Sequence, residues 1–252
     1  MADSNRKTIS RDAFDAVLFD LDGVITATAD IHAVAWKNLF DGYLRARADA
    51  SGAPFRAFDI EADYVVYVDG KPRYEGVQSF LKSRDIHLDF GTPDDAADLE
   101  TACGLGNRKN ILFNNILRDK GAHVFDNSVE CVKALIDAGI RVAVVSSSKN
   151  CVTVLKSAGI SDLFEVRIDG AEAAKLGLPG KPNPDTFLEA ARRLGVTAAR
   201  AVVVEDAISG VQAGRAGNFG LVVGVDRTGE ADALRENGAH IVVEDLGELN
   251  VE

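Results

Sequence analysis

The chain has 252 residues, of which 46% are hydrophobic, enough to bury a sizeable core in one large domain or two smaller ones. Lys and Arg together number 28 against 39 Asp and Glu, which gives a formal net charge of −11. This balance argues against binding to nucleic acid or to an anionic membrane, because both favour clustered positive charge, and a small anionic substrate would need a locally positive pocket.

Cysteine usage and hydropathy indicate a cytoplasmic protein. The three cysteines, Cys103, Cys131 and Cys151, lack the spacing of metal ligands or of a redox pair, so we expect buried, reduced thiols. The segment 1–10 is polar and has no apolar stretch of the kind found in signal peptides. No run of eighteen apolar residues occurs, so we predict no transmembrane helix.

The predicted elements change character twice along the chain. An apolar, partly β-branched strand is predicted over 16–19. From residue 28 to about residue 120 the pattern predicts helices over 29–46, 75–83 and 108–118, with a short extended run over 64–68. Beyond residue 126 the order is regular, with helices over 129–138, 151–158, 185–194 and 207–216, and strands over 141–145, 164–168, 201–204 and 220–223.

Strands separated by single helices are typical of a parallel sheet. We therefore predict an α/β fold whose core is a doubly wound, Rossmann-like parallel sheet built from residues 1–26 and 122–252. The intervening residues 27–121 are predicted to form a mainly helical cap domain inserted into that core.

Four polar segments are predicted to meet at one edge of this sheet: Asp20-Leu21-Asp22-Gly23, Ser146-Ser147-Ser148, Gly180-Lys181-Pro182 and Glu205-Asp206. Ligands of doubly wound sheets bind outside the carboxyl ends of the strands. The four segments together therefore predict a phosphate site.

The two carboxylates after the first strand suggest distinct roles in phosphoryl transfer. Asp20, on a rigid strand end, can attack phosphorus and form an acyl phosphate, which splits one difficult transfer into two easier ones. Asp22 can protonate the departing oxygen and later take a proton from the incoming one. Together they predict covalent catalysis with a general acid and base.

The other polar residues suit the charge of a phosphate. Two carboxylates near a phosphate need a hard cation, and Glu205 and Asp206 supply the oxygen ligands that Mg²⁺ prefers. Ser146 can bind a phosphate oxygen, and Lys181 adds a positive charge beside Asp20.

Each segment also has a structural interpretation. Asp-x-Asp-Gly is common in turns, the serines 146–148 could cap a helix, residues 180–184 could form a rigid loop, and Glu205-Asp206 could cap the helix that follows. Their occurrence together and in this order favours catalysis.

In this order the motifs resemble those of the haloacid dehalogenase superfamily, and most closely its β-phosphoglucomutase-like subfamily. Residues 19–26, Phe-Asp-Leu-Asp-Gly-Val-Ile-Thr, match the nucleophile loop of that subfamily, and Thr28, His32 and Trp36 continue the match. The stretch Ser146-Ser147-Ser148-Lys149-Asn150 resembles its phosphate loop, whereas general phosphatases of the superfamily usually keep only the first hydroxyl.

The resemblance implies a role for each matching residue. Asp20 would be the nucleophile, Asp22 the acid and base, Lys181 and Ser146 the groups that hold the transferring phosphoryl group, and Asp20, the Asp22 carbonyl, Glu205 and Asp206 the Mg²⁺ ligands. Substrate binding would involve Thr28, His32, Arg73, Lys109, Ser147, Ser148, Lys149 and Asn150. Among these, Arg73 and the stretch 148–150 would bind a second, distal phosphate, Lys109 the sugar, and His32 would couple substrate binding to the orientation of the acid and base.

The implied activity is an isomerisation in carbohydrate metabolism. An aspartyl phosphate would pass its phosphoryl group to β-glucose 1-phosphate to give a bisphosphate, whose other phosphoryl group would return to Asp20 and so release glucose 6-phosphate. Two departures from the subfamily, Ala27 in place of a common Asp and a long cap segment over 42–63, keep the substrate open.

The alternatives are a Mg²⁺-dependent sugar-phosphate phosphatase and a non-catalytic phosphosugar-binding protein. Arg73, Lys109 and His32 also have ordinary explanations, as a turn residue, an exposed helix residue and a packed histidine. We assign Phe113, Phe187, His87, His123 and His240 to packing or surface. The predicted partner is a small sugar phosphate, with neither nucleic acid nor membrane; the oligomeric state is not predicted, and a monomer is compatible.

Overall fold

The computed structural model describes residues 7–252. The segment 1–10, for which no signal peptide was predicted, therefore lies partly outside the described residues. The described chain forms two compact units, one of residues 7–27 and 122–252 and the other of residues 28–121. No helix in the described range is long and apolar enough to span a bilayer.

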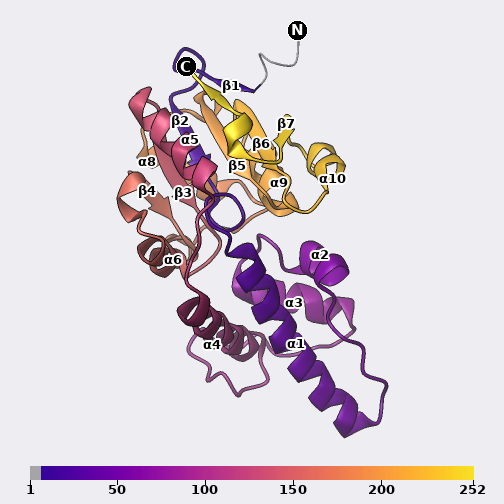
Figure 1. The fold of residues 1–252 in the computed structure, drawn as a ribbon. Helices are drawn as coiled ribbons and strands as arrows, with labels where there is room; N and C mark the ends of the chain where they lie inside the picture. The colour runs from indigo at the N-terminus through magenta and orange to yellow at the C-terminus, as the bar shows by residue number, and fades with distance from the viewer. Residues whose placement is uncertain (1–6) are drawn as a thin grey trace. The chain divides into compact units, whose positions relative to one another are not determined.

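The first unit contains a parallel sheet of six strands in the order β4-β3-β2-β5-β6-β7 (Figure 1). The central strand β2 pairs in register with both neighbours, Leu18 lying opposite Ala143 and Val203. A separate two-stranded parallel sheet pairs β1 with β8. The strands are β1 (Thr8–Ile9), β2 (Ala16–Phe19), β3 (Arg141–Val145), β4 (Val166–Ile168), β5 (Ala201–Glu205), β6 (Leu221–Val225), β7 (Ile241–Val243) and β8 (Asn250–Val251).

Helices connect successive strands of the large sheet, as parallel pairing requires. Alternate residues of the strands, such as Leu18, Ala143 and Val203, pack in one hydrophobic core with residues of the helices that follow, such as Phe187 and Val211. The helices of this unit are α5 (Asp126–Asp137), α6 (Cys151–Ser157), α7 (Gly170–Leu176), α8 (Asp185–Arg193), α9 (Ile208–Ala216) and α10 (Ala231–Glu236), with short 3-10 helices at Ser161–Leu163, Ala198–Arg200 and Leu246–Glu248.

The predicted α/β fold with a parallel sheet is confirmed, and β3 has the predicted bounds. The sequence did not reveal α7, α10 or β7, which have 7, 6 and 3 residues. Short elements give few residues for a hydrophobic period to emerge, although α6, which also has 7 residues, was predicted within one residue. The cysteines Cys103, Cys131 and Cys151 are buried, as expected.

The second unit is helical, with α1 (Ala29–Ser51), a π-helix (Ile60–Tyr64), α2 (Val65–Tyr67), α3 (Arg73–Ser83) and α4 (Ala102–Lys120). Its core is aromatic: Phe40 stacks or tilts against Trp36, Phe58 and Phe80, with ring centroids 5.3, 5.1 and 4.1 Å away. These aromatic side chains join α1, α3 and the segment at Phe58 in one cluster, to which α4 contributes Ala102 and Leu105.

The predicted extended run over 64–68 is wrong, because these residues lie in the π-helix, in α2 and just after it. β-Branched residues favoured a strand, but Asp59 overrides this preference by accepting hydrogen bonds from the amides of Glu61 and Ala62 at the helix start. Asp63, buried in the same turn, pairs with Arg84 at 2.5 Å. Tertiary contacts therefore determine the conformation here.

The long segment over 42–63 continues α1 to Ser51 and then returns along the unit. Gly52 ends the helix in the left-handed conformation, with φ of 71°. Phe58 on the return segment is fully buried in the aromatic core, and its amide donates to Asp41 at 2.7 Å. The added length thus contributes to the core of this unit.

Candidate active site

The candidate catalytic residues lie where the order of strands reverses. The chain runs from β2 outward to β3 and β4, then returns to the other side of β2 as β5. Crevices at such switch points are the usual ligand sites of doubly wound sheets. Asp20 follows β2, Ser146 follows β3 and Asp206 follows β5, and the Asp20 amide donates to the Val204 carbonyl at 2.9 Å.

The loop after β2 turns sharply at Gly23. This glycine has φ of 86°, a conformation that other residues rarely adopt. A Cβ atom at this position would lie 1.7 Å from Oδ2 of Asp206, so a side chain here would displace that carboxylate. The Gly23 amide donates to the Thr26 carbonyl at 2.7 Å and closes the loop that carries Asp22.

Lys181 lies at the centre of the site and is only 1% exposed. Its ammonium group contacts Asp20 Oδ1, Glu205 Oε1 at 2.5 Å and the Val145 carbonyl at 3.0 Å. The ring of Phe187 lies 4.9 Å from the same nitrogen. A buried cation between two buried carboxylates is thereby supplied with partners on several sides.

The protonation of this cluster follows from burial and from its opposite charges. Burial disfavours the charged form of Lys181, but Asp20 and Glu205 outweigh this and raise the pKa of the lysine. Burial raises the pKa of Asp20, while Lys181 acts in the opposite direction. Lys181 is therefore an ammonium ion at neutral pH, and a further cation beside Asp20 would favour its carboxylate form.

Three carboxylates could hold a metal ion. Within residues 7–252, Asp20, Glu205 and Asp206 each offer an oxygen atom, and these atoms all lie within 4.8 Å of one another. An all-oxygen donor set suits a hard divalent cation. The Glu205 carboxylate is already engaged by Lys181 and by the Ala207 amide at 3.2 Å, and Asp20 is engaged by the same lysine. The participation of the Asp22 carbonyl stays a prediction.

The loop after β3 connects the acid–base candidate to the predicted phosphate loop. Ser146, which is 4% exposed, donates from Oγ to Asp22 Oδ2 at 3.3 Å. The same Oγ accepts from the Ser148 amide, and Ser148 Oγ accepts from the Asn150 amide, both at 3.1 Å. The hydrogen bonds of these serines therefore order the loop over several residues, rather than capping the start of a helix at a single residue.

A close contact also restrains Ser147 and Lys149 in this loop. A Cβ atom on Gly170 would lie 2.4 Å from the Ser147 carbonyl oxygen and 3.1 Å from the Lys149 amide nitrogen. The backbone of α7 thus packs directly against the loop. The roles predicted for Ser147, Ser148, Lys149 and Asn150 in substrate binding stay predictions.

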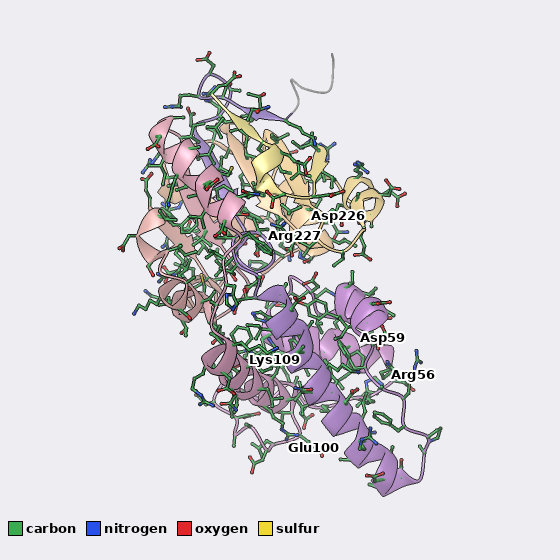
Figure 2. The ribbon with its side chains drawn as sticks, in the orientation of Figure 1. Arg56, Asp59, Glu100, Lys109, Asp226 and Arg227 are labelled. Atoms are coloured by element: carbon green, nitrogen blue, oxygen red, sulfur yellow. The ribbon has the colours of Figure 1, made fainter. Side chains whose placement is uncertain are left out.

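In the helical unit, the structure brings Lys109 and His32 together. Lys109 Nζ lies 2.6 Å from His32 Nδ1 and 4.9 and 5.0 Å from the ring centroids of Trp36 and Phe113 (Figure 2). Lys109 is only 3% exposed, so its ordinary explanation as an exposed helix residue is wrong. The aromatic rings attract the ammonium group and partly offset the cost of burying it.

Arg73 and Thr28 lie at the starts of helices in the same unit. Arg73 is the first residue of α3, donates to Asn110 Oδ1 at 2.8 Å, and has its pKa lowered by burial. Thr28 is fully buried, and its carbonyl accepts from the His32 amide at 3.0 Å. Within each unit, therefore, several predicted residues lie close together.

Two aromatic residues that were predicted only to pack contact the candidate lysines. Phe113 packs against Lys109, and Phe187 packs against Lys181. The contact of Phe113 could have been found, because it follows Lys109 by four residues on one helix and so shares its face. Phe187 belongs to the contact between α8 and the sheet, which no local pattern reveals.

Comparison with known proteins yields matches over most of the chain. A family model described as haloacid dehalogenase-like hydrolase matches residues 14–218. A β-phosphoglucomutase of Mycobacterium bovis is 53% identical over 237 residues, covering 93% of this chain and 90% of the relative. One of Bacillus subtilis is 30% identical, covering 94% and 92%. The crystal structure of a β-phosphoglucomutase from Clostridium difficile aligns with a TM-score of 0.73 and 26% identity, over 94% of this chain and 93% of that one.

Proposed function

Because the chain belongs to the haloacid dehalogenase-like hydrolase family, we propose that it is a Mg²⁺-dependent β-phosphoglucomutase that acts through an aspartyl phosphate. The substrate would be β-glucose 1-phosphate and the product glucose 6-phosphate. One observation carries the proposal: Asp20 lies at the end of the central strand, paired with a buried lysine and within reach of the cation ligands Glu205 and Asp206. The mutases from M. bovis and B. subtilis support the choice of substrate.

In the first half of the proposed cycle, Asp20 carries the phosphoryl group. The 6-hydroxyl oxygen of β-glucose 1-phosphate attacks phosphorus, and the bond between phosphorus and Asp20 Oδ breaks. Asp22 accepts the hydroxyl proton, so the products are glucose 1,6-bisphosphate, a free Asp20 carboxylate and a protonated Asp22.

The second half reverses these roles on the other end of the sugar. Asp20 attacks the phosphorus at position 1, and the bond between that phosphorus and the sugar oxygen breaks. Asp22 returns its proton to the departing oxygen, which leaves glucose 6-phosphate and regenerates phosphorylated Asp20. The hydrogen bond from Ser146 to Asp22 would orient the acid and base in both halves.

Charge in the site would be balanced by Lys181 and by the metal. The lysine ammonium holds Asp20 in place and offsets negative charge on the phosphoryl oxygens. Mg²⁺ held by Asp20, Glu205 and Asp206 would neutralise further charge on the transferring group.

A mutase must also bind the phosphate that is not reacting. We assign this task to Arg73 and to Ser148, Lys149 and Asn150, and we assign Lys109 and His32 to the sugar. Arg73 presents a planar fork of donors suited to phosphate, and Lys109 is held by aromatic rings that exclude water. Thr28 and Ser147 complete the proposed set.

Phosphorus NMR tests the proposal directly. The protein is mixed with Mg²⁺, β-glucose 1-phosphate and a trace of glucose 1,6-bisphosphate, and the signals of glucose 6-phosphate and inorganic phosphate are followed. We expect glucose 6-phosphate to form in an amount equal to the substrate consumed, with no activity in the Asp20→Asn variant.

Two other outcomes would contradict it. Inorganic phosphate as the main product would identify a phosphatase, which agrees with the description of the matching family model as a hydrolase. A wild-type protein that turns over no phosphomonoester would indicate a phosphosugar-binding protein.

A further inference from the structure

Arg227, on the loop that follows β6, contacts the loop that carries Asp22 (Figure 2). Its Nε donates to the Gly23 carbonyl at 2.9 Å, although the two residues are far apart in the sequence. No role was predicted for Arg227 from the sequence, because its loop carries none of the four motifs.

This hydrogen bond acts at a glycine of the catalytic loop. Glycine has more backbone freedom than any other residue, and Gly23 directly follows Asp22. The peptide unit before Gly23 is fixed by its amide, which donates to the Thr26 carbonyl at 2.7 Å. The peptide unit after Gly23 is fixed by Arg227. Each of these two hydrogen bonds therefore restrains one of the two peptide planes at this glycine.

Arg227 is itself held firmly enough to serve as a support. Its guanidinium carbon lies 3.8 Å from the centroid of the Phe125 ring, and Nη1 donates to the Glu244 carbonyl at 2.9 Å. The Phe125 amide in turn donates to the Ile25 carbonyl at 2.9 Å. The planar group therefore joins the catalytic loop, the segment at Phe125 and the loop after β7.

We infer that Arg227 is a positioning residue, which orients Asp22 for proton transfer by fixing the carbonyl of Gly23. The inference rests on the proposed function insofar as Asp22 is the general acid and base. A poorly placed acid harms reactions with poor leaving groups more than those with good ones, since only the former need a proton as the bond breaks.

The test compares two substrates in the full-length protein. β-Glucose 1-phosphate has a poor leaving group, and p-nitrophenyl phosphate has a good one. In Arg227→Met we expect the ratio of kcat/KM for the sugar phosphate to that for p-nitrophenyl phosphate to fall about 10-fold or more, mainly through kcat. Arg227→Lys, which can still donate one hydrogen bond to Gly23, should recover part of the ratio. An unchanged ratio in Arg227→Met would overturn the inference.

Arg141→Met is the matched control. Arg141 also bonds a backbone carbonyl, that of Leu194, and a carboxylate, that of Glu165. It is the first residue of β3, however, and so lies at the amino ends of the strands, away from the loops that follow β2 and β6. Its removal should leave the substrate ratio at the wild-type value. If Arg227→Met does not fold, Phe125→Leu, which removes the ring beneath the guanidinium, should lower the ratio at least threefold, and an unchanged ratio there would overturn the inference.

Hydrogen exchange provides a readout that does not depend on turnover. The amides of residues 21–26 should exchange about 10-fold faster in Arg227→Met than in the wild type, and at the wild-type rate in Arg141→Met. Unchanged exchange in Arg227→Met would refute the positioning role whatever the enzyme's substrate. A wild-type protein without turnover, by contrast, would refute the proposed function while the exchange result still decides the role of Arg227.

Discussion

Lys181 connects stability and chemistry at the level of a single side chain. It is buried with two carboxylates, Asp20 and Glu205, each of which needs a positive partner in this environment. The lysine that we propose to offset charge on a phosphoryl group is thus also the positive partner of two buried carboxylates. A substitution at this residue therefore affects both roles at once.

We expect Lys181→Met to lower the free energy of unfolding by about 3–5 kcal/mol, since it leaves two buried carboxylates without their cation. Urea unfolding at pH 7 measures the change, and turnover should be lost as well. Lys175→Met is the control: its ammonium lies 4.0 Å from Glu172 and its side chain is 77% exposed, so stability should change little. Wild-type stability in Lys181→Met would contradict this view of the cluster.

The sequence identifies some of these residues more readily than others. Asp20 and Asp206 directly follow strands that are apolar along most of their length, so an edge position could be predicted. Phe187 and Arg227 could not be assigned in this way, because their relevance arises from contacts with Lys181 and Gly23 that only the tertiary structure creates.

At the level of elements, the loop after β2 shows why one position of a turn requires glycine. Several glycines of this chain have positive φ, and Gly139 does so in open space, because a Cβ atom there would meet no atom within 4 Å. Gly23 combines the same backbone conformation with the close approach of Asp206. A substitution at Gly23 is therefore unfavourable for two reasons: the positive φ, and the contact of the new side chain with Asp206.

The pair Gly23→Ala and Gly139→Ala separates these effects. Both should lose about 1 kcal/mol or more of stability, since alanine disfavours a positive φ. Only Gly23→Ala should also lose turnover, because it displaces Asp206. Denaturant unfolding and steady-state kinetics on both variants check this expectation. Equal activities would show that displacing Asp206 does not affect turnover.

A second prediction at this level concerns the start of α3. Arg73→Ala should reduce conversion of β-glucose 1-phosphate at least 10-fold while turnover of p-nitrophenyl phosphate, which has no second phosphate, stays near wild type. Arg118→Ala, at an exposed position near the end of α4, serves as the control. A proportional loss on both substrates would contradict the assignment of Arg73 to the distal phosphate.

The helices and strands were predicted most accurately in the regular alternation after residue 140. The bounds of β3 match, and α6, α8 and α9 lie within one residue of the predicted ranges, whereas α1 ends five residues later and α4 begins six residues earlier than predicted. The failure at 64–68 has a definite cause: the hydrogen bonds of Asp59 at the helix start and the buried pair of Asp63 with Arg84 outweigh local strand propensity. Of these interactions, the pair with Arg84 joins residues too far apart in the chain for a local pattern to include it.

For the molecule as a whole, acid should weaken the fold through surface carboxylates paired with arginines. Hydrogen bonds from Arg200 and Arg11 lower the pKa of Asp15 to about 2, from an ordinary value of 3.8. A lowered pKa in the folded state stabilises the protein above the unfolded pKa, and this contribution is lost as the pH falls from about 4 to about 2.

The measurement is the urea midpoint of the wild type and of Asp15→Asn at two pH values. One is about pH 5, where Asp15 is ionised in both states, and the other is about pH 2.5, where most of the contribution is lost. The wild type should lose more stability between these values than the variant, which has no carboxylate to protonate at this position. Asp12→Asn provides a neighbouring control. Parallel losses in the wild type and Asp15→Asn would contradict a stabilising role for the ionised Asp15.

The central position of β2 has a consequence for how the protein is made. This strand is translated early, yet both of its partners, β3 and β5, come from the second half of the chain. Until the ribosome has passed Glu205, an apolar strand with the sequence Ala-Val-Leu-Phe has no complete sheet to join. Contacts this distant in sequence slow folding. Until they form, the unpaired apolar strand is exposed to other nascent chains. Placing Asp20 directly after the innermost strand therefore means that its surroundings form only once the distant strands β3 and β5 have been made.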